Sequence, residues 1–283
     1  MTGFAGLVDL AQSNGSSAVA VAWADGRVES WAAGGDLPRE TMSVTKFVVG
    51  TVLGTCLAVA DLDLPLSTWI SEWADEPRGD ITLRRVLRHT SGLEVRPAAD
   101  VYAAESIESL ALSLPLIDPG PFAYNNVAIH LAAVVVQRHS GRSLDSWGAD
   151  VFTAMQIAAW DWQRDPQGFP LCMAGLSLRA VDLARVGALH LEGTLLPGDW
   201  VSAMAPQAPQ EIGLCAFADY AWIRRGDEGV QVGPRTGYGH IGDYGQHLTV
   251  QPEIGLAAVR YTDTRDREHA WDGFAGAVRE HLA

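Results

Sequence analysis

Lysine is almost absent from this sequence. The 283 residues include 20 of the lysine and arginine types, and Lys46 is the only lysine among them. Arginine cannot lose its proton near neutral pH, whereas a lysine buried beside polar groups can become a neutral amine and act as a base. The single retained lysine is therefore a candidate catalytic base.

Basic charge and long apolar runs are also scarce. Aspartate and glutamate number 34, so the net charge is −14 at pH 7 and the isoelectric point is near 4.9. This balance argues against a nucleic acid or an anionic membrane as partner and leaves a small molecule as the expected one. No window holds 18 apolar residues in a row, and the first residues lack the basic start and apolar stretch of a signal peptide. We expect a cytoplasmic protein, whose oligomeric state the sequence leaves open.

Cysteine and several familiar motifs are missing or rare. Cys56, Cys172 and Cys215 are odd in number and far apart, which favours reduced thiols over a disulfide framework. No Cys-x-x-Cys pair or His-Glu-x-x-His motif indicates a common zinc site, and no glycine-rich nucleotide loop follows a strand. No Gly-x-Ser-x-Gly elbow indicates an α/β-hydrolase. The sequence thus predicts neither a metal nor a cofactor.

Strand patterns occupy both ends of the chain and helical patterns its middle. Residues 18–23 and 28–31 predict a hairpin around Asp25-Gly26, and strands are expected again over 214–224, 244–250 and 256–261. We predict an α/β, more narrowly α+β, fold in which an antiparallel sheet built from both chain ends is flanked by helices, with a mostly helical region inserted. The predicted sheet region is 1–40 with 205–283, the helical region is 41–204, and the active site lies at their interface. Helices are expected over 43–60, 66–73, 82–92, 105–114, 127–138, 143–155, 177–192, 197–204 and 271–282, and an ordered loop over 160–170.

The stretch Ser43-Val44-Thr45-Lys46 combines a hydroxyl with the only lysine. Residues three apart share one face of a helix, so the Ser43 hydroxyl and the Lys46 amine can come within hydrogen-bonding distance. Such a pair supplies a nucleophile and its activator. The alternative is an ordinary helix start, with Ser43 as a cap and Lys46 as a solvated charge, because so short a motif often occurs by chance.

Three further motifs follow in order along the chain: His89-Thr90-Ser91-Gly92-Leu93, Tyr124-x-Asn126 and Gly239-His240-Ile241-Gly242. With Ser43-x-x-Lys46 before them, the chain resembles the serine hydrolases of the β-lactamase and penicillin-binding-protein superfamily. The branch it resembles is related to class C β-lactamases, D-aminopeptidases, family VIII carboxylesterases and 6-aminohexanoate-dimer hydrolases. The resemblance runs from about Ala18 to the end of the chain.

The resemblance implies a role for each motif residue. Ser43 would be the acylated nucleophile, Lys46 its proton acceptor and Tyr124 the group that carries the proton to the leaving group, although which of the last two is the resting base stays open. Asn126 would hold Lys46 or the acyl amide, or else cap a helix. The backbone N–H groups of Ser43 and Asp243 would form the oxyanion hole.

The strand motif departs from the family pattern. His240-Ile241-Gly242 stands where the family carries Lys-Thr-Gly, whose lysine helps to bind the substrate carboxylate. This replacement puts β-lactam hydrolysis in doubt. His89 is expected to be structural, linking a helix end to the loop that follows it.

The predicted function is that of a serine hydrolase acting on a small ester or amide through an acyl-enzyme on Ser43, with a carboxylesterase narrowly favoured. An amidase, a D-peptidase or an acyltransferase using the same site remains an alternative. A non-catalytic ligand-binding protein on this fold ranks lower because Ser43, Lys46 and Tyr124 are all present.

Overall fold

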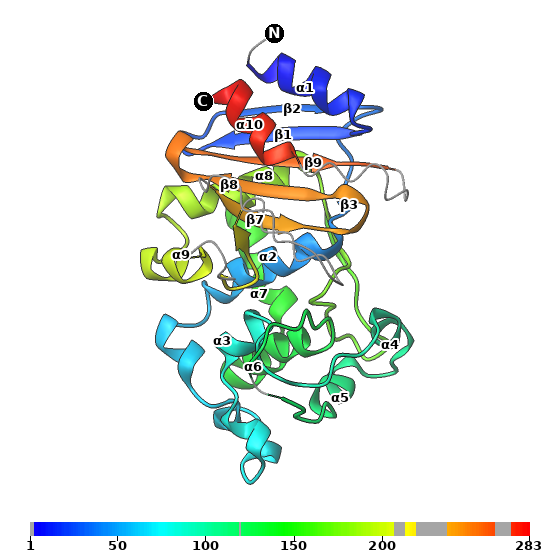
Figure 1. Ribbon diagram of the computed structural model, residues 1–283, viewed down its shortest axis with the longest axis vertical. Coiled ribbons are helices and arrows are strands. Elements are labelled where there is room, and N and C mark those ends of the chain that lie inside the picture. Colours follow the sequence, from blue (N-terminus) through cyan, green and yellow to red (C-terminus); the bar gives the residue numbers. More distant parts are fainter. Residues whose placement is uncertain (1–2, 119, 207–212, 219–236, 264–272) are drawn as a thin grey trace.

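A six-stranded antiparallel sheet forms one half of the molecule (Figure 1). The structure, a computed structural model, describes residues 3–118, 120–206, 213–218, 237–263 and 273–283. The strand order is β2-β1-β9-β8-β7-β6, and every neighbouring pair is antiparallel. The strands are β1 (Ala18–Trp23), β2 (Val28–Ala32), β6 (Phe217–Ala218), β7 (Tyr238–Ile241), β8 (His247–Gln251) and β9 (Leu256–Tyr261).

The two ends of the chain meet in the middle of this sheet. β1 and β2 form the hairpin expected around Gly26, and β1 pairs along its length with β9, from Ala18 opposite Tyr261 to Trp23 opposite Leu256. Figure 1 places the N- and C-terminal segments side by side at the same end of the molecule. The predicted fold class, an antiparallel sheet from both chain ends combined with helices, is confirmed.

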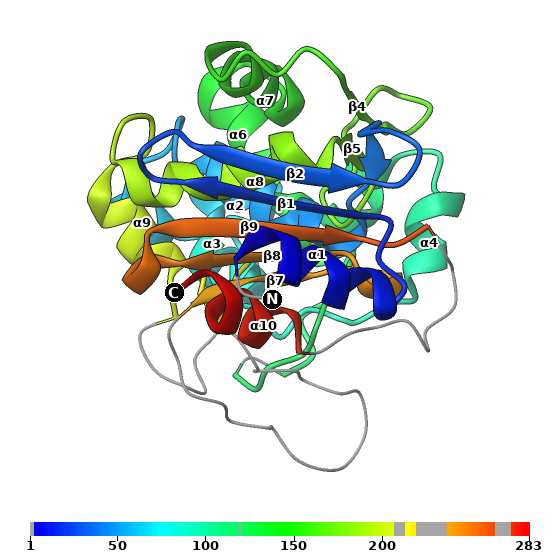
Figure 2. The same ribbon diagram turned by 90° about the horizontal axis from the view of Figure 1, so that it is seen from above.

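Helices cover both faces of the sheet because successive strand residues point to opposite sides. Val19 and Val21 of β1 pack with α1 (Phe4–Ser13) and α10 (Phe274–Leu282), whereas Ala18, Ala20 and Ala22 belong to the larger core on the other side. Figure 2 shows α1 and α10 on one side of the sheet and α8 (Ala180–Glu192) with α2 (Thr45–Leu53) on the other. The N-terminal helix α1 was not predicted from the sequence.

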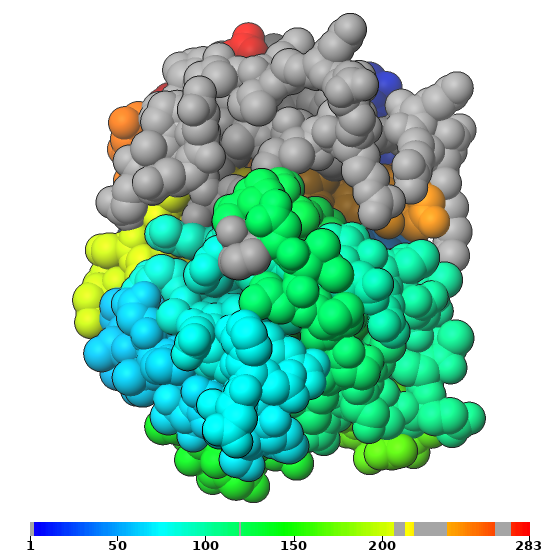
Figure 3. All heavy atoms as spheres, turned by 60° about the horizontal axis from the view of Figure 1, so that its bottom comes forward, coloured from blue at the N-terminus to red at the C-terminus, as the bar shows by residue number. Residues whose placement is uncertain are grey.

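The middle of the chain forms a mainly helical half. Figure 3 shows its surface, coloured from light blue to green. Its helices are α3 (Leu83–Leu87), α4 (Ala98–Ala103), α5 (Ile107–Leu112), α6 (Leu131–Ser140), α7 (Leu144–Ala154) and α9 (Gly198–Met204). Local chemistry sets two helix ends here: the Thr82 side chain caps α3 by accepting from the Arg85 N–H, and Gly141 ends α6 in the left-handed conformation.

A small second sheet corrects two predictions. Its strands β3 (Arg39–Glu40), β5 (Leu176–Leu178) and β4 (Trp160–Trp162) lie in the order β3-β5-β4. The expected helix from residue 177 therefore begins only at Ala180, and part of the expected loop over 160–170 is a strand. Leu176 and Leu178 are buried and Ser177 is less so, which is the two-residue period of a strand.

Several element boundaries also differ from the prediction. The helix expected over 43–60 consists of a 3₁₀ turn (Met42–Val44) followed by α2, and it ends where Gly54 packs against the Trp200 ring. The helix expected over 66–73 is two 3₁₀ turns (Leu66–Thr68 and Ser71–Trp73). The strand expected over 214–224 is seen only as β6, since 219–224 lie outside the described residues, as does the start of the helix expected from 271.

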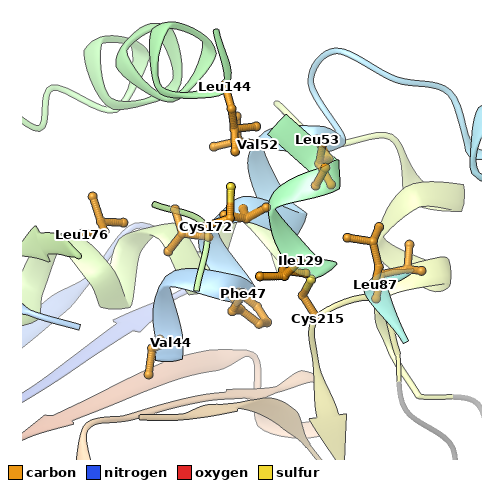
Figure 4. Close-up of a cluster of buried hydrophobic side chains, with 14 of the residues drawn as sticks. Val44, Phe47, Val52, Leu53, Leu87, Ile129, Leu144, Cys172, Leu176 and Cys215 are labelled. Carbon is orange, nitrogen blue, oxygen red and sulfur yellow. The ribbon is translucent and has the colours of Figure 1, made fainter. Parts of the chain in front are cut away.

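Helix α2 is the central element between the two halves. All nine of its residues are buried. Figure 4 shows Val44 pointing toward the strands of the large sheet and Val52 beside Leu144 of α7. The division into 1–40 with 205–283 and 41–204 remains a prediction, and α8, which falls in the second range, packs on β1 and β9. No helix in the described part of the chain is long and apolar enough to cross a membrane.

Candidate active site

The start of α2 is anchored to the small sheet. The Thr41 and Thr45 hydroxyls share a hydrogen bond of 2.9 Å, and the Thr41 N–H donates to the Leu176 carbonyl at 2.8 Å. The Leu176 N–H in turn donates to the Thr45 hydroxyl at 3.3 Å. These buried bonds hold the turn that carries Ser43 against β5, so the serine has a fixed place at the junction of the two halves.

Lys46 is buried and contacts Ser43. Its Nζ lies 3.1 Å from Ser43 Oγ and donates to the Met173 carbonyl oxygen at 2.7 Å, and the residue is 0% exposed. Burial lowers the pKa of Lys46 to about 7, although the charge of Asp243 opposes this shift. A solvated surface charge, the alternative considered for Lys46, is therefore wrong, and the amine is within reach of neutrality at ordinary pH.

Tyr124 completes the contact with Ser43. Its ring centroid is 4.9 Å from Lys46 Nζ. Burial raises the pKa of the Tyr124 hydroxyl, and a hydrogen bond with Ser43 offsets only part of that rise. The tyrosine is therefore a neutral phenol at pH 7, able to donate or relay a proton. Of the two groups, Lys46 has the pKa closer to neutrality.

The loop bearing Tyr124 is fastened by His89 and Asn125. The Asn125 N–H donates to His89 Nδ1 at 3.1 Å, the Ala123 N–H donates to the His89 carbonyl at 2.8 Å, and the His89 ring lies 4.5 Å from the Tyr124 ring. The structural role predicted for His89 is confirmed. Burial lowers the pKa of His89 to about 3, so its ring is neutral.

Asn125, for which the sequence indicated no role, makes the helix-capping hydrogen bonds that were one of the two roles suggested for Asn126. The Asn125 side chain accepts from the N–H groups of Val127 and Ala128 and donates to the Leu93 and Glu94 carbonyls. The helix-capping role considered for Asn126 is therefore wrong. Asn126 Oδ1 is buried without a partner, and no hydrogen bond joins it to Lys46 in the described part of the chain. Asn126 was singled out only because it lies two residues after Tyr124. That spacing does not show which of the two adjacent asparagines makes the structural hydrogen bonds.

The end of β7 lies against the Ser43 turn. A Cβ placed on Gly242 would stand 2.7 Å from Met42 Cβ, 2.8 Å from the Thr41 carbonyl oxygen and 3.1 Å from the Ser43 nitrogen. Glycine is required here for close approach, since no larger residue fits. Among the described residues, the N–H groups of Ser43 and Asp243 donate to no backbone carbonyl. Both remain available to a developing oxyanion.

His240 and Ile241 sit on β7 just before that glycine. His240 is 3% exposed, with its ring 5.0 Å from the Phe217 ring and 6.5 Å from the Tyr124 ring. Ile241 pairs with His247 of β8 and is only partly buried. The structure thus brings Ser43, Lys46, Tyr124 and the His240–Asp243 segment together.

Backbone strain gathers around the same place. Among the described residues, five that are not glycine have positive φ angles; Met42, His89 and Tyr244 adjoin or contact a residue of the site, and Cys215 lies near enough to Lys46 to affect its pKa. Such conformations cost about 1–3 kcal/mol each and persist only where the surroundings enforce them. Their clustering indicates that this region is shaped for something other than stability.

A metal site is not found. The described residues contain no group of three or more histidine, cysteine or acidic side chains arranged to hold a metal ion. The three cysteines are free thiols, as the sequence predicted.

Comparison with known proteins finds one matching family model, described as Beta-lactamase, over residues 7–282. The 6-aminohexanoate-dimer hydrolase of Paenarthrobacter ureafaciens is 23% identical over 279 residues, covering 84% of this chain and 69% of that protein. A crystal structure from Bacteroides dorei DSM 17855, assigned as a β-lactamase, superposes with a TM-score of 0.78 at 17% identity over 100% of this chain and 99% of that one. The penicillin-binding protein from Bacillus halodurans gives a TM-score of 0.74 at 16% identity over 96% and 98%.

Proposed function

The chain belongs to the β-lactamase family and is a serine hydrolase, and from this premise we propose that it hydrolyses small amides through an acyl-enzyme on Ser43. The observation that carries the proposal is the buried Lys46 amine, 3.1 Å from Ser43 Oγ and with a pKa lowered to about 7. A serine hydroxyl is a poor nucleophile until a neighbouring base removes its proton. Here that base is present, positioned and close to neutral.

In the first half of the reaction Ser43 Oγ bonds to the amide carbonyl carbon and its proton passes to Lys46 Nζ. The Lys46 N–H that donates to the Met173 carbonyl holds Nζ beside Ser43 Oγ, and in the neutral amine the lone pair accepts the serine proton. The negative carbonyl oxygen is met by the backbone N–H groups of Ser43 and Asp243. Preorganised donors of this kind stabilise the tetrahedral intermediate without having to move.

In the second half the carbon–nitrogen bond breaks and the leaving nitrogen takes a proton. The Tyr124 hydroxyl, in contact with Ser43 and near Lys46 Nζ, relays that proton from Lys46 to the amine. Water then attacks the ester on Ser43, releasing the carboxylic acid and restoring the serine. A positioned acid–base group of this type contributes about 10²–10⁴-fold to the rate.

The choice of amides rests on the relative from Paenarthrobacter ureafaciens, whose name is that of a hydrolase of the 6-aminohexanoate dimer. The carboxylesterase narrowly favoured by the sequence is kept as the second activity of the same site. The catalytic groups described above also cleave esters, because an ester is the easier acyl donor. Relative rates on matched anilides and phenyl esters decide between them.

The experiment that tests the proposal is labelling with an active-site-directed fluorophosphonate, followed by intact-mass and peptide mapping. We expect one adduct, on Ser43, and none in the Ser43→Ala variant. An adduct on another serine, or no adduct in a folded sample, would contradict the proposal.

A further inference from the structure

The Lys46 amine is held in part by a group that takes no part in bond making. In the described part of the chain its hydrogen-bond partners are Ser43 Oγ, at 3.1 Å, and the Met173 carbonyl oxygen, at 2.7 Å. Ser43 Oγ becomes acylated, so the carbonyl is the partner of the two that stays unchanged through the reaction. Because this carbonyl belongs to the backbone, its position depends on how the segment around Met173 is fixed.

Met173 lies in the segment 163–175 between β4 and β5, which we call the base loop. The Gln163 N–H donates to the Gly175 carbonyl at 2.9 Å, and the Leu171 N–H donates to the Gln163 carbonyl at 3.0 Å. A Cβ on Gly175 would stand 2.9 Å from Gln163 Cβ, so glycine is required for this close approach. The short span from Leu171 to Gly175, with Met173 at its centre, is thus tied at both ends to the residue that follows β4.

Trp162, the last residue of β4, adds a side-chain bond to this span. Its indole N–H donates to the Leu171 carbonyl at 2.7 Å, and the residue is 1% exposed. Its ring packs against α7, where a Cβ on Gly148 would stand only 2.8 Å from Trp162 Cζ3. A phenylalanine would fill much of the same space, but it could not donate to the buried carbonyl, and an unpaired buried carbonyl costs free energy. The indole N–H therefore fixes the peptide two residues before Met173.

The charge state of Lys46 depends on the hydrogen bond to Met173. A carbonyl that accepts from an ammonium group stabilises its charged form, whereas burial opposes that form. Among the described titratable groups around Lys46, Asp243 is the carboxylate. Burial raises the pKa values of the phenol and the thiols and lowers those of the imidazoles, so the remaining groups are uncharged at neutral pH: Tyr124, Cys172, Cys215, His89, His130 and His240. Loss of the Met173 acceptor would therefore lower the pKa of Lys46 further and leave the amine less firmly placed.

We propose that Trp162 is a positioning residue for the catalytic base. Its indole N–H orients the Leu171 carbonyl, the base loop carries this orientation to the Met173 carbonyl, and that carbonyl holds the Lys46 amine beside Ser43. This inference rests on the serine hydrolase proposed above and adds a residue that acts through Lys46. Trp162 thereby connects α7, in the helical half, with the proton acceptor of the site.

The test is the pH profile of Ser43 labelling by the fluorophosphonate in the Trp162→Phe variant, which keeps an aromatic ring and removes the N–H. We expect the rate on the high-pH plateau to fall by up to about 10²-fold, the cost of misplacing a reacting group by about 1 Å. We also expect the midpoint of the profile to move to lower pH by about 0.5–1 unit, because the charged amine loses part of a hydrogen bond. A loss of stability alone would move neither quantity in a sample that circular dichroism shows to be folded.

A second variant and a matched control sharpen the result. Gly148→Ala keeps the indole N–H but places a methyl group 2.8 Å from Trp162 Cζ3, so the ring has to move; we expect shifts in the same directions and of smaller size. The control is Trp200→Phe, which also removes a buried indole N–H, one that donates to the Gly50 carbonyl of α2 at 3.0 Å. Since that carbonyl lies outside the base loop, this variant should keep the wild-type midpoint.

Labelling of the wild-type protein in the same experiment separates the two proposals. If Ser43 is labelled but folded Trp162→Phe keeps the wild-type plateau and midpoint, or Trp200→Phe shifts the midpoint equally, the role of Trp162 is overturned and the serine hydrolase stands. If Trp162→Phe does not fold, a wild-type profile in Gly148→Ala overturns that role instead. If Ser43 of the wild-type protein is not labelled, the proposed function fails and the role of Trp162 fails with it.

Discussion

Two groups of buried side chains that include histidine lie near α2, and they differ in whether both ring nitrogens of each histidine are hydrogen-bonded. In the first group, which we call the closed network, Thr51 donates to the Phe47 carbonyl at 3.0 Å, so the His190 Nε2–H has to donate to the Thr51 hydroxyl at 2.9 Å. The His190 Nδ1 then accepts from the Tyr238 hydroxyl at 3.2 Å. In the second group, formed by His89 and His240 and called the open pair, each ring uses Nδ1 and leaves a buried Nε2 without a partner among the described residues.

The two groups differ in the hydrogen-bonding capacity that they leave unused. In both groups burial lowers the histidine pKa, that of His190 and His89 to about 3, so neither group is a reservoir of protons at neutral pH. Every polar atom of the closed network is satisfied inside the protein, which is what a stabilising bridge between α2, α8 and β7 requires. Both rings of the open pair lie near Tyr124, and each keeps one ring nitrogen free to bond a molecule that enters the site.

The largest expected effect comes from the base beside the open pair. Lys46→Arg keeps a positive charge but cannot accept a proton, so we expect the labelling rate of Ser43 to fall by about 10²–10⁴-fold. Stopped-time labelling with intact-mass detection measures it, and circular dichroism reports the fold. Near-wild-type labelling by this variant would mean that Lys46 acts only as a charge.

A smaller loss of acylation rate is expected when the end of β7 is displaced from Ser43. Gly242→Ala introduces a Cβ that stands 2.8 Å from the Thr41 carbonyl oxygen, so the end of β7 has to shift and the oxyanion donors separate. We expect acylation to slow by about 10²–10³-fold, the range for loss of one oxyanion donor. The matched control is Gly198→Ala, where the added Cβ meets nothing within 4 Å. Equal rates in the two variants would contradict the packing argument.

The smallest effect on activity is expected from the closed network. His190→Leu leaves the Tyr238 hydroxyl and Thr51 without their buried partner, and it should lower the free energy of unfolding by about 1–3 kcal/mol. Denaturant unfolding measures that loss, with His139→Leu on the surface as the control. The comparison fails if His190→Leu slows labelling strongly while leaving stability unchanged.

Much of this arrangement could be predicted from the sequence because its signals are local. The hairpin around Gly26, the cap at Thr82 and the glycine after α6 follow from short-range turn and helix chemistry. The Ser43 and Lys46 contact follows from their spacing of three residues. The four motifs occur in the order typical of a known family, and the resemblance to that family implied the fold.

The predictions that failed depend on contacts between distant segments. Leu176–Leu178 is a strand because β3 and β4 pair with it, and the local sequence does not indicate that these distant segments are its partners. Asn125 rather than Asn126 holds the tyrosine loop because His89 and the Leu93 carbonyl lie opposite it. The unpaired nitrogen of His240 depends on its bond to the Ile241 carbonyl, which only the folded strand reveals.

The central claim, that Lys46 is the neutral base that activates Ser43, is tested most directly by the pH dependence of Ser43 labelling. Because burial lowers the pKa of Lys46 to about 7, the active form is the one without the proton. The labelling rate should rise about tenfold per pH unit below that value and level off above it. A rate that does not change between pH 5.5 and 9, or one that still climbs tenfold per unit above pH 9 as for an ordinary lysine, would contradict the claim.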